Sequence, residues 1–92
     1  MTTVKWTSKA MFDLERLHRF LAPMDPAAAA RAVQAITTAP KRLLERPRIG
    51  QRLEEFDPRE VRRLLVGDYE IRYEITATTL YVLRLWHTRE DR

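Results

Sequence analysis

Residues 61–87, VRRLLVGDYEIRYEITATTLYVLRLWH, contain three β-favouring runs separated by two turn signals, and they decide the fold. The middle run alternates: two tyrosines and two isoleucines share one face, with glutamate, arginine and glutamate on the other, as in an antiparallel strand with one buried face. Gly67 and Asp68 form a tight hairpin signal, and the segment TATT supplies the second turn. We therefore expect a three-stranded antiparallel meander, with strands over 61–66, 69–75 and 80–87.

The N-terminal part predicts a short strand followed by a helix. TVKWT at 3–7 alternates in polarity and is rich in β-favouring residues. From Ser8, the expected N-cap, apolar residues recur at steps of three and four, which is the period of an amphipathic helix. Pro23 should end this helix near Ala22.

A second helix is predicted to begin at Pro26, with Asp25 as its N-cap, because proline is favoured in the first helical position. The pattern continues to about residue 45, and Pro40 should kink or break it. Residues 46–60 show no sustained period and are expected to form a loop. The predicted fold class is thus α+β: an N-terminal strand, a helical hairpin and the meander, with both helices on one face of a small sheet and the other face exposed.

Composition limits the chain, residues 1–92, to one domain. With 45% hydrophobic and 33% charged residues, no run reaches the roughly 18 apolar residues of a membrane span. The first residues are too charged for a signal peptide, and there are no cysteines, so we expect a cytoplasmic protein without disulfides or thiolate metal sites. His18 and His87 lack partners at metal-ligand spacing, and we expect neither metal nor cofactor.

The net charge of +4 comes from 17 basic residues, of which 14 are arginines, and 13 acidic ones. Arg72 and Arg84 share strand parity on neighbouring strands, and Glu70 and Glu74 are placed to separate their charges. Two readings remain open: a solvated, charge-balanced sheet face, or a basic surface for an acidic segment or a phosphate backbone. Trp86 shares this parity and is either a core residue or an exposed interface anchor.

The order of elements, together with the segments VKWTSKAMFDLERLHRFL, RPRIGQRLEE, YEIRYEI and LRLWHTREDR, resembles the RelE/ParE toxin superfamily. These are toxins of type II toxin–antitoxin modules, also known as plasmid stabilisation proteins. RelE-type members are ribosome-dependent mRNA endonucleases, whereas ParE-type members poison DNA gyrase without nuclease activity.

The resemblance is closer to the ParE type and implies a gyrase inhibitor rather than an enzyme. IRYEI and RLWHTRED resemble ParE, whereas Arg62 and Arg63 stand where RelE-type nucleases favour lysines, and Glu70 where they have arginine. The chain also has no tyrosine after Arg92 to act as acid or base. The target-binding residues implied are Arg72, Arg84, Trp86, His87 and Arg89.

The alternatives are a RelE-like endoribonuclease without metal, using His87, Arg89 and Arg63, or a homologue that binds antitoxin but is not toxic. The resemblance also implies a hetero-oligomer with a ParD-like antitoxin. Leu14, Leu17 and Leu21 are expected to bind the antitoxin if their apolar stripe is not fully buried.

Overall fold

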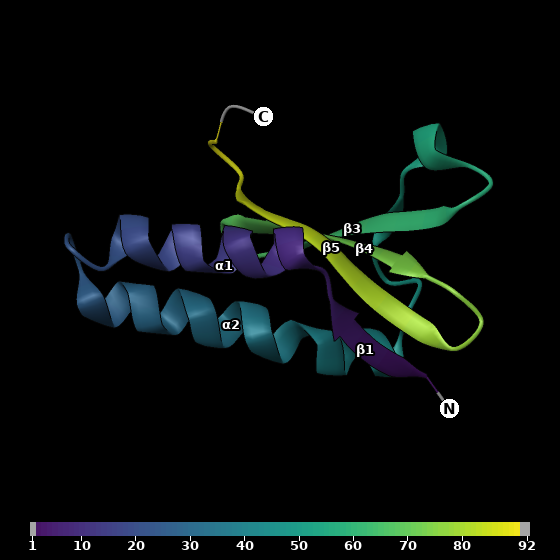
Figure 1. The fold of residues 1–92 in the computed structure, drawn as a ribbon, viewed down its shortest axis with the longest axis horizontal. Helices are drawn as coiled ribbons and strands as arrows, with labels where there is room; N and C mark the ends of the chain where they lie inside the picture. Colours follow the sequence, from purple (N-terminus) through teal and green to yellow (C-terminus); the bar gives the residue numbers. More distant parts are fainter. Residues whose placement is uncertain (1, 91–92) are drawn as a thin grey trace.

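The computed structural model describes residues 2–90 and has the expected α+β architecture (Figure 1). Two helices form an antiparallel hairpin against a five-stranded sheet. The elements in chain order are β1 (Thr3–Trp6), α1 (Ser8–Leu21), α2 (Pro26–Glu45), β2 (Gln51–Arg52), the 3₁₀ turn η1 (Glu54–Phe56), β3 (Glu60–Val66), β4 (Tyr69–Ile75) and β5 (Thr79–His87).

The start of α1 differs from the prediction by one residue. Thr7, not Ser8, is the N-cap: its backbone is extended, and its side chain accepts a hydrogen bond from the backbone N–H of Ala10. Ser8 already lies inside the helix. Two hydroxyl residues in succession leave this choice open in the sequence, and it is settled because the Thr7 hydroxyl also donates to the carbonyl of Leu83 on β5.

Pro40 was predicted to kink or break the second helix, and the prediction of a break was wrong. Asp25 caps α2 and Pro26 begins it, as expected, but the helix then runs through Pro40 to Glu45. Pro40 is buried together with Ile36 and Leu43, on the side of α2 that packs on the core. Burial of this apolar face stabilises the helix enough to offset one missing backbone hydrogen bond.

The sheet has the strand order β1-β5-β4-β3-β2. The predicted meander of β3, β4 and β5 is confirmed, and β1 adds to it in parallel beside β5. Strand β2 was missed, because two residues paired with Arg63 and Arg62 are too short to produce a periodic signal.

A β-bulge in β5 determines which side chains face the helices. Arg72 pairs with Arg84 and Tyr73 with Val82, so Leu83 is an extra residue without a partner on β4. The bulge lets Val82 and Leu85 both enter the core, which strict alternation would not allow.

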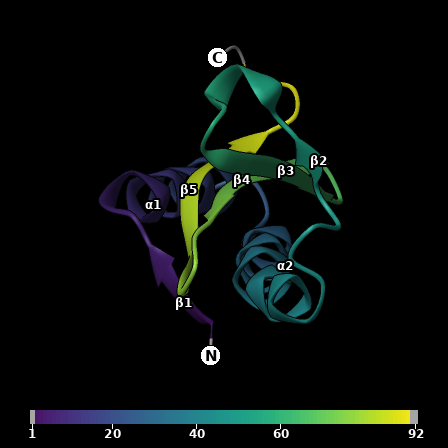
Figure 2. The same cartoon turned by 90° about the vertical axis from the view of Figure 1, so that its right-hand side faces the viewer.

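The helices cover one face of the sheet, where Ile36 and Leu43 of α2 join Ile71, Tyr73 and Leu85 in the core. The opposite face, which we call the outer face, was expected to be exposed and is only partly so. Figure 2 shows α2 on one side of the sheet and η1 on the other. Residues buried on the outer face include Glu70, which is 1% exposed, and Trp86, which is 8% exposed.

Candidate functional site

Three arginines lie in line across the outer face. Arg63 of β3 is directly opposite Arg72 of β4, and Arg72 is directly opposite Arg84 of β5. Their side chains are 38%, 24% and 38% exposed, in that order. We call these three residues the arginine row. The predicted proximity of Arg72 and Arg84 is confirmed.

Aromatic rings support the guanidinium groups of the arginine row. The guanidinium carbon of Arg72 lies 4.6 Å from the ring centroid of Trp86 and 5.4 Å from that of Phe56 in η1. The guanidinium carbon of Arg84 lies 5.2 Å from the ring centroid of Trp86. Stacking of this kind uses the face of a guanidinium and leaves its N–H edge for other partners. Trp86 is therefore a buried support beneath the arginines, and its reading as an exposed anchor is wrong.

Two buried carboxylates balance part of the charge of the arginine row. The carboxylate of Glu70 lies 3.5 Å from Arg63 and 3.6 Å from Arg72. The expectation for Glu74 was wrong, because its carboxylate forms an ion pair with Arg59 at the end of the sheet instead. The second carboxylate comes from Asp13 on α1.

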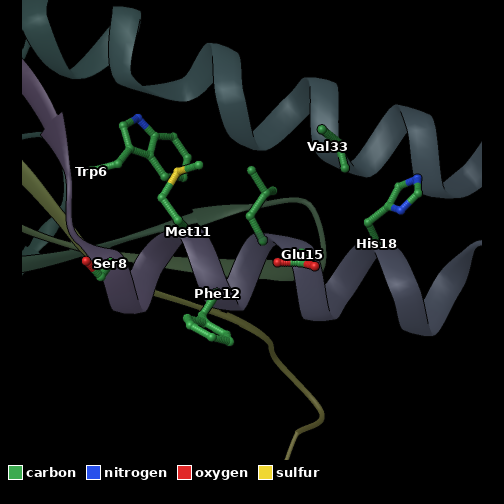
Figure 3. Close-up of a pocket in the computed structure, with 8 residues that line it drawn as sticks. Trp6, Ser8, Met11, Phe12, Glu15, His18 and Val33 are labelled. Carbon is green, nitrogen blue, oxygen red and sulfur yellow. The ribbon is translucent and has the colours of Figure 1, made fainter.

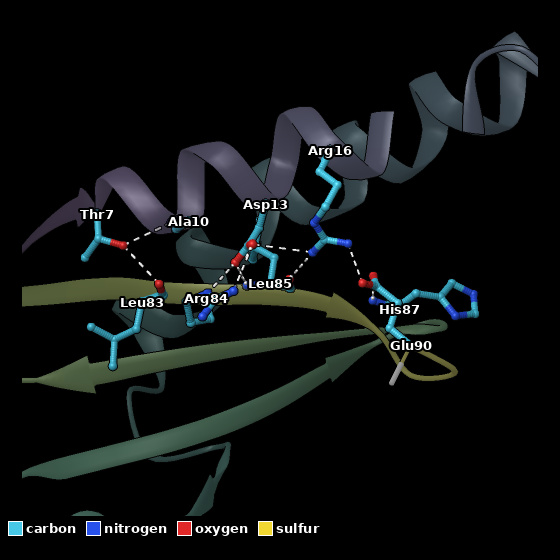
Figure 4. Close-up of polar contacts among 9 residues, drawn as sticks. All are labelled: Thr7, Ala10, Asp13, Arg16, Leu83, Arg84, Leu85, His87 and Glu90. Atoms are coloured by element: carbon cyan, nitrogen blue, oxygen red, sulfur yellow. Dashed lines mark hydrogen bonds and ion pairs between the residues drawn. The ribbon is translucent and has the colours of Figure 1, made fainter. Parts of the chain in front are cut away.

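Asp13 is 4% exposed and holds Arg84 through two hydrogen bonds, 2.8 Å from Nε to Oδ2 and 3.2 Å from Nη2 to Oδ1 (Figure 4). It also accepts the backbone N–H of Leu85 at 2.9 Å. Burial by itself would raise the pKa of Asp13, but the hydrogen bonds from Arg84 and Leu85 and the charge of Arg84 lower the pKa overall. No sequence signal pointed to Asp13, because its partner is 71 residues away.

His87 and Arg89 do not join the arginine row. Since neighbouring strand residues face opposite sides, His87 lies on the helix side of the sheet, where its ring meets that of Tyr69 edge-on at 5.3 Å. The Nδ1 atom of His87 accepts the backbone N–H of Arg89 at 3.1 Å. The predicted target-binding set is thus divided between two faces, and His87 is separated from Arg63. Asp91 and Arg92 of the quoted tail lie outside the described residues.

His87 and Arg89 instead border a cleft of about 460 Å³, which we call the tail cleft. Its other wall is the C-terminal half of α1, including Phe20 and Leu21. Glu90 fixes the turn at the end of β5, because its carboxylate accepts the backbone N–H of His87 and pairs with Arg16.

A second hollow of about 570 Å³ lies between α1 and α2, and we call it the hairpin groove. In Figure 3 the side chains of Trp6, Met11, His18 and Val33 lie between the two helices, whereas Phe12 points away on the far side of α1. Met11 is 53% exposed and Phe12 75%.

The three leucines predicted to bind antitoxin have different positions. Leu14 lines the hairpin groove, and Leu21 lines the tail cleft. Leu17 also borders the tail cleft, but it is only 4% exposed and belongs to the hydrophobic core. The apolar stripe is therefore buried at this residue, and the prediction required that it should not be. The periodicity located the inward stripe of α1 but could not reveal the apolar residues outside it.

Within residues 2–90, no three histidine, aspartate or glutamate side chains gather closely enough to hold a metal ion. Over the same residues, neither helix combines the length and the apolar composition needed to cross a bilayer.

A family model described as the ParE toxin of type II toxin–antitoxin systems, parDE, matches residues 4–92. The chain belongs to this toxin family. A relative of this ParE-family chain, Toxin RelE2 of Caulobacter vibrioides, is 32% identical over 87 residues, which cover 95% of the chain and 96% of the relative. A solved structure titled "Chromosomal ParDE TA system from P. aeruginosa" matches with a TM-score of 0.78 and 26% identity, covering 95% of the chain and 96% of its own.

These comparisons confirm the resemblance and the RelE/ParE-like fold class. The two names also differ in type, one being RelE and the other ParDE. The names of these relatives therefore do not distinguish DNA gyrase from the ribosome as the target, and the positions of the side chains become the relevant observation.

Proposed function

We propose that this ParE-family toxin inhibits DNA gyrase by binding it through the arginine row, and that a ParD-like antitoxin neutralises it. The observation that supports binding over catalysis is the separation of His87 from the arginines. Cutting RNA without a metal requires an acid or base close to the groups that stabilise the phosphate. In this chain the arginines lie on the outer face and His87 faces the tail cleft.

The arginine row has the properties of a docking surface. Its side chains are partly exposed, and aromatic stacking and carboxylates hold them in place, so little side-chain entropy is lost when a partner binds. Arg72 has a buried Nε atom that makes no hydrogen bond within residues 2–90. Arginine forks pair well with carboxylates and phosphates, which a gyrase–DNA complex presents.

Neutralisation by an antitoxin is supported by apolar surface elsewhere on the molecule. Met11 at the hairpin groove, Phe12 on the far side of α1 and Phe20 at the tail cleft are all more than half exposed. Such residues are suited to receive the apolar side chains of an amphipathic segment, while the net charge of +4 attracts an acidic one.

The test is to express the chain alone in a bacterium and follow the DNA-damage response and transcript integrity in the same culture. A damage response with intact transcripts is expected. Arg63→Gln should reduce this response, whereas Arg59→Gln is the matched control, because Arg59 is an exposed, ion-paired arginine outside the arginine row.

Three results would contradict the proposal in different ways. Cleaved transcripts without DNA damage would assign the chain to the endoribonucleases. Harmless expression of the folded chain would make it a non-toxic partner of its antitoxin. Equal toxicity of Arg63→Gln and the unmodified chain at matched expression would remove Arg63 from the docking surface.

A further inference from the structure

The carboxylate of Asp13 is buried and accepts hydrogen bonds from several neighbouring groups. It accepts two hydrogen bonds from Arg84 and one from the backbone of Leu85, and Nη2 of Arg16 lies 3.4 Å from its Oδ1. A carboxylate that is 4% exposed in a surface helix needs such partners, since burying an unpaired charge is strongly unfavourable. One of these partners, Arg84, belongs to the arginine row.

The position of Asp13 follows from the way in which α1 covers the edge of β5. Strand β1 pairs with β5 only as far as Trp6 and Val82, and the chain then turns into α1. Beyond this point, side chains take over the free backbone groups of β5. The hydroxyl of Thr7 bonds to the carbonyl of Leu83, Asp13 accepts the N–H of Leu85, and Arg16 donates to the carbonyl of Leu85. We call this arrangement the side-chain seal (Figure 4).

The seal fixes the position of α1 along β5, so that both oxygens of Asp13 accept hydrogen bonds from the guanidinium group of Arg84. This two-pronged contact restrains a guanidinium more strongly than a point contact does. It uses Nε and Nη2 of Arg84, whereas Nη1 makes no hydrogen bond within residues 2–90, and the guanidinium carbon lies 5.2 Å from the ring centroid of Trp86. A long, flexible side chain is thereby kept in one orientation.

We infer that Asp13 is a positioning residue of the toxin: it holds Arg84 in line with Arg63 and Arg72 so that the arginine row is ordered before a target binds. This inference rests on the proposed function of the arginine row. Asp13 itself does not touch the target; it acts through Arg84. Without it, binding would have to order the Arg84 side chain, and affinity would fall.

The test compares Asp13→Asn with Glu15→Gln, which removes an exposed acid of the same helix that pairs with Arg19. The first readout is the Nε–H signal of Arg84 in nuclear magnetic resonance spectra of the free protein. We expect this proton to be protected from solvent exchange in the unmodified chain and in Glu15→Gln, and to lose its protection in Asp13→Asn. Unchanged protection in Asp13→Asn would overturn the inference, whatever the target.

The second readout is the dissociation constant for purified DNA gyrase. Asp13→Asn should raise it about three- to tenfold, the cost of ordering one long side chain. The same substitution made on top of Arg84→Gln should have no further effect, because the residue through which Asp13 acts is gone. A purely structural role predicts the same loss in both backgrounds and would overturn the inference. If Arg84→Gln alone leaves the affinity unchanged, the docking role proposed for Arg84 fails, while the exchange measurement still tests whether Asp13 orders the Arg84 side chain.

Arg84→Lys tests the same contact if Asp13→Asn does not fold. A lysine keeps the charge and the ion pair with Asp13 but cannot form two parallel hydrogen bonds. Weaker binding of gyrase by a folded Arg84→Lys variant would support the inference that the two hydrogen bonds to Asp13 position the Arg84 side chain. Unchanged affinity would overturn it.

Discussion

The hydroxyl group of Tyr73 accepts a hydrogen bond from the backbone N–H of Gly50 at 3.1 Å and donates one to the carbonyl of Pro47 at 2.6 Å. One side chain from the middle of β4 thus holds the segment that leads from α2 into β2. Tyr73 is fully buried, and burial, as the largest influence, raises the pKa of its hydroxyl. The hydroxyl therefore remains a proton donor at neutral pH.

Tyr73→Phe should lower the free energy of unfolding by about 1–3 kcal/mol, because the buried N–H of Gly50 and carbonyl of Pro47 lose their partner. Urea denaturation measures the change. Tyr81→Phe is the control, since the hydroxyl of Tyr81 makes no hydrogen bond within residues 2–90. Equal stabilities for the two variants would show that the Tyr73 contacts are not stabilising.

Gly50→Ala should destabilise the chain more than Gly67→Ala does. A Cβ atom at Gly50 would lie 2.6 Å from both the carbonyl oxygen of Arg63 and the hydroxyl of Tyr73, so backbone or core must move. Gly67 has open space around it, and its cost comes only from its positive φ of 58°, roughly 1 kcal/mol. Thermal unfolding of both variants gives the order, and the reverse order would contradict the close approach at Gly50.

Because of Asp13, the folded chain should lose stability in acid. Its pKa is lower in the folded chain than in the unfolded one, so its stabilising contribution is complete above the unfolded pKa of about 3.9. The contribution is lost as the pH falls through the lower, folded pKa. Asp13→Asn should therefore flatten the decline in melting temperature below about pH 4, while Glu15→Gln, at an exposed position, should leave it unchanged. A parallel decline in all three proteins would contradict the prediction.

Leu17→Ala should affect the stability of the chain, whereas Phe20→Ala should affect its binding of a partner. Leu17 is a core residue, and its truncation should cost about 2–5 kcal/mol of stability. Phe20 is 69% exposed, so its truncation should change stability by at most about 0.5 kcal/mol. We expect Phe20→Ala instead to weaken binding of the proposed ParD-like antitoxin. Isothermal titration calorimetry measures this, with Leu44→Ala, at a 42% exposed residue of α2, as the control. Unchanged affinity would exclude Phe20 from that interface.

The strands and helices were predictable where a period extends over several residues. The alternation of β4 gave the bounds Tyr69–Ile75 without error, and Pro26 marked the start of α2. Features that depend on a single residue or a distant contact were not predictable. The bulge at Leu83 leaves no mark in a run that is apolar almost throughout, and two-residue β2 has no period.

The candidate site was predicted in part for the same reason. Parity along the strands brought Arg72, Arg84 and Trp86 to one face. It could not show that Trp86 lies beneath the arginines, that Phe56 approaches from η1, or that Asp13 reaches across from α1. These contacts join segments far apart in the chain, and a pattern within one segment carries no information about them.

The side-chain seal also limits how other chains can assemble with this one. Beyond Val82, a peptide cannot extend the sheet by lying along β5, because α1 already occupies that edge. The outer strands left at the two ends of the sheet, β1 and β2, are four and two residues long. Edge strands as short as these give little length for the addition of a strand from another chain.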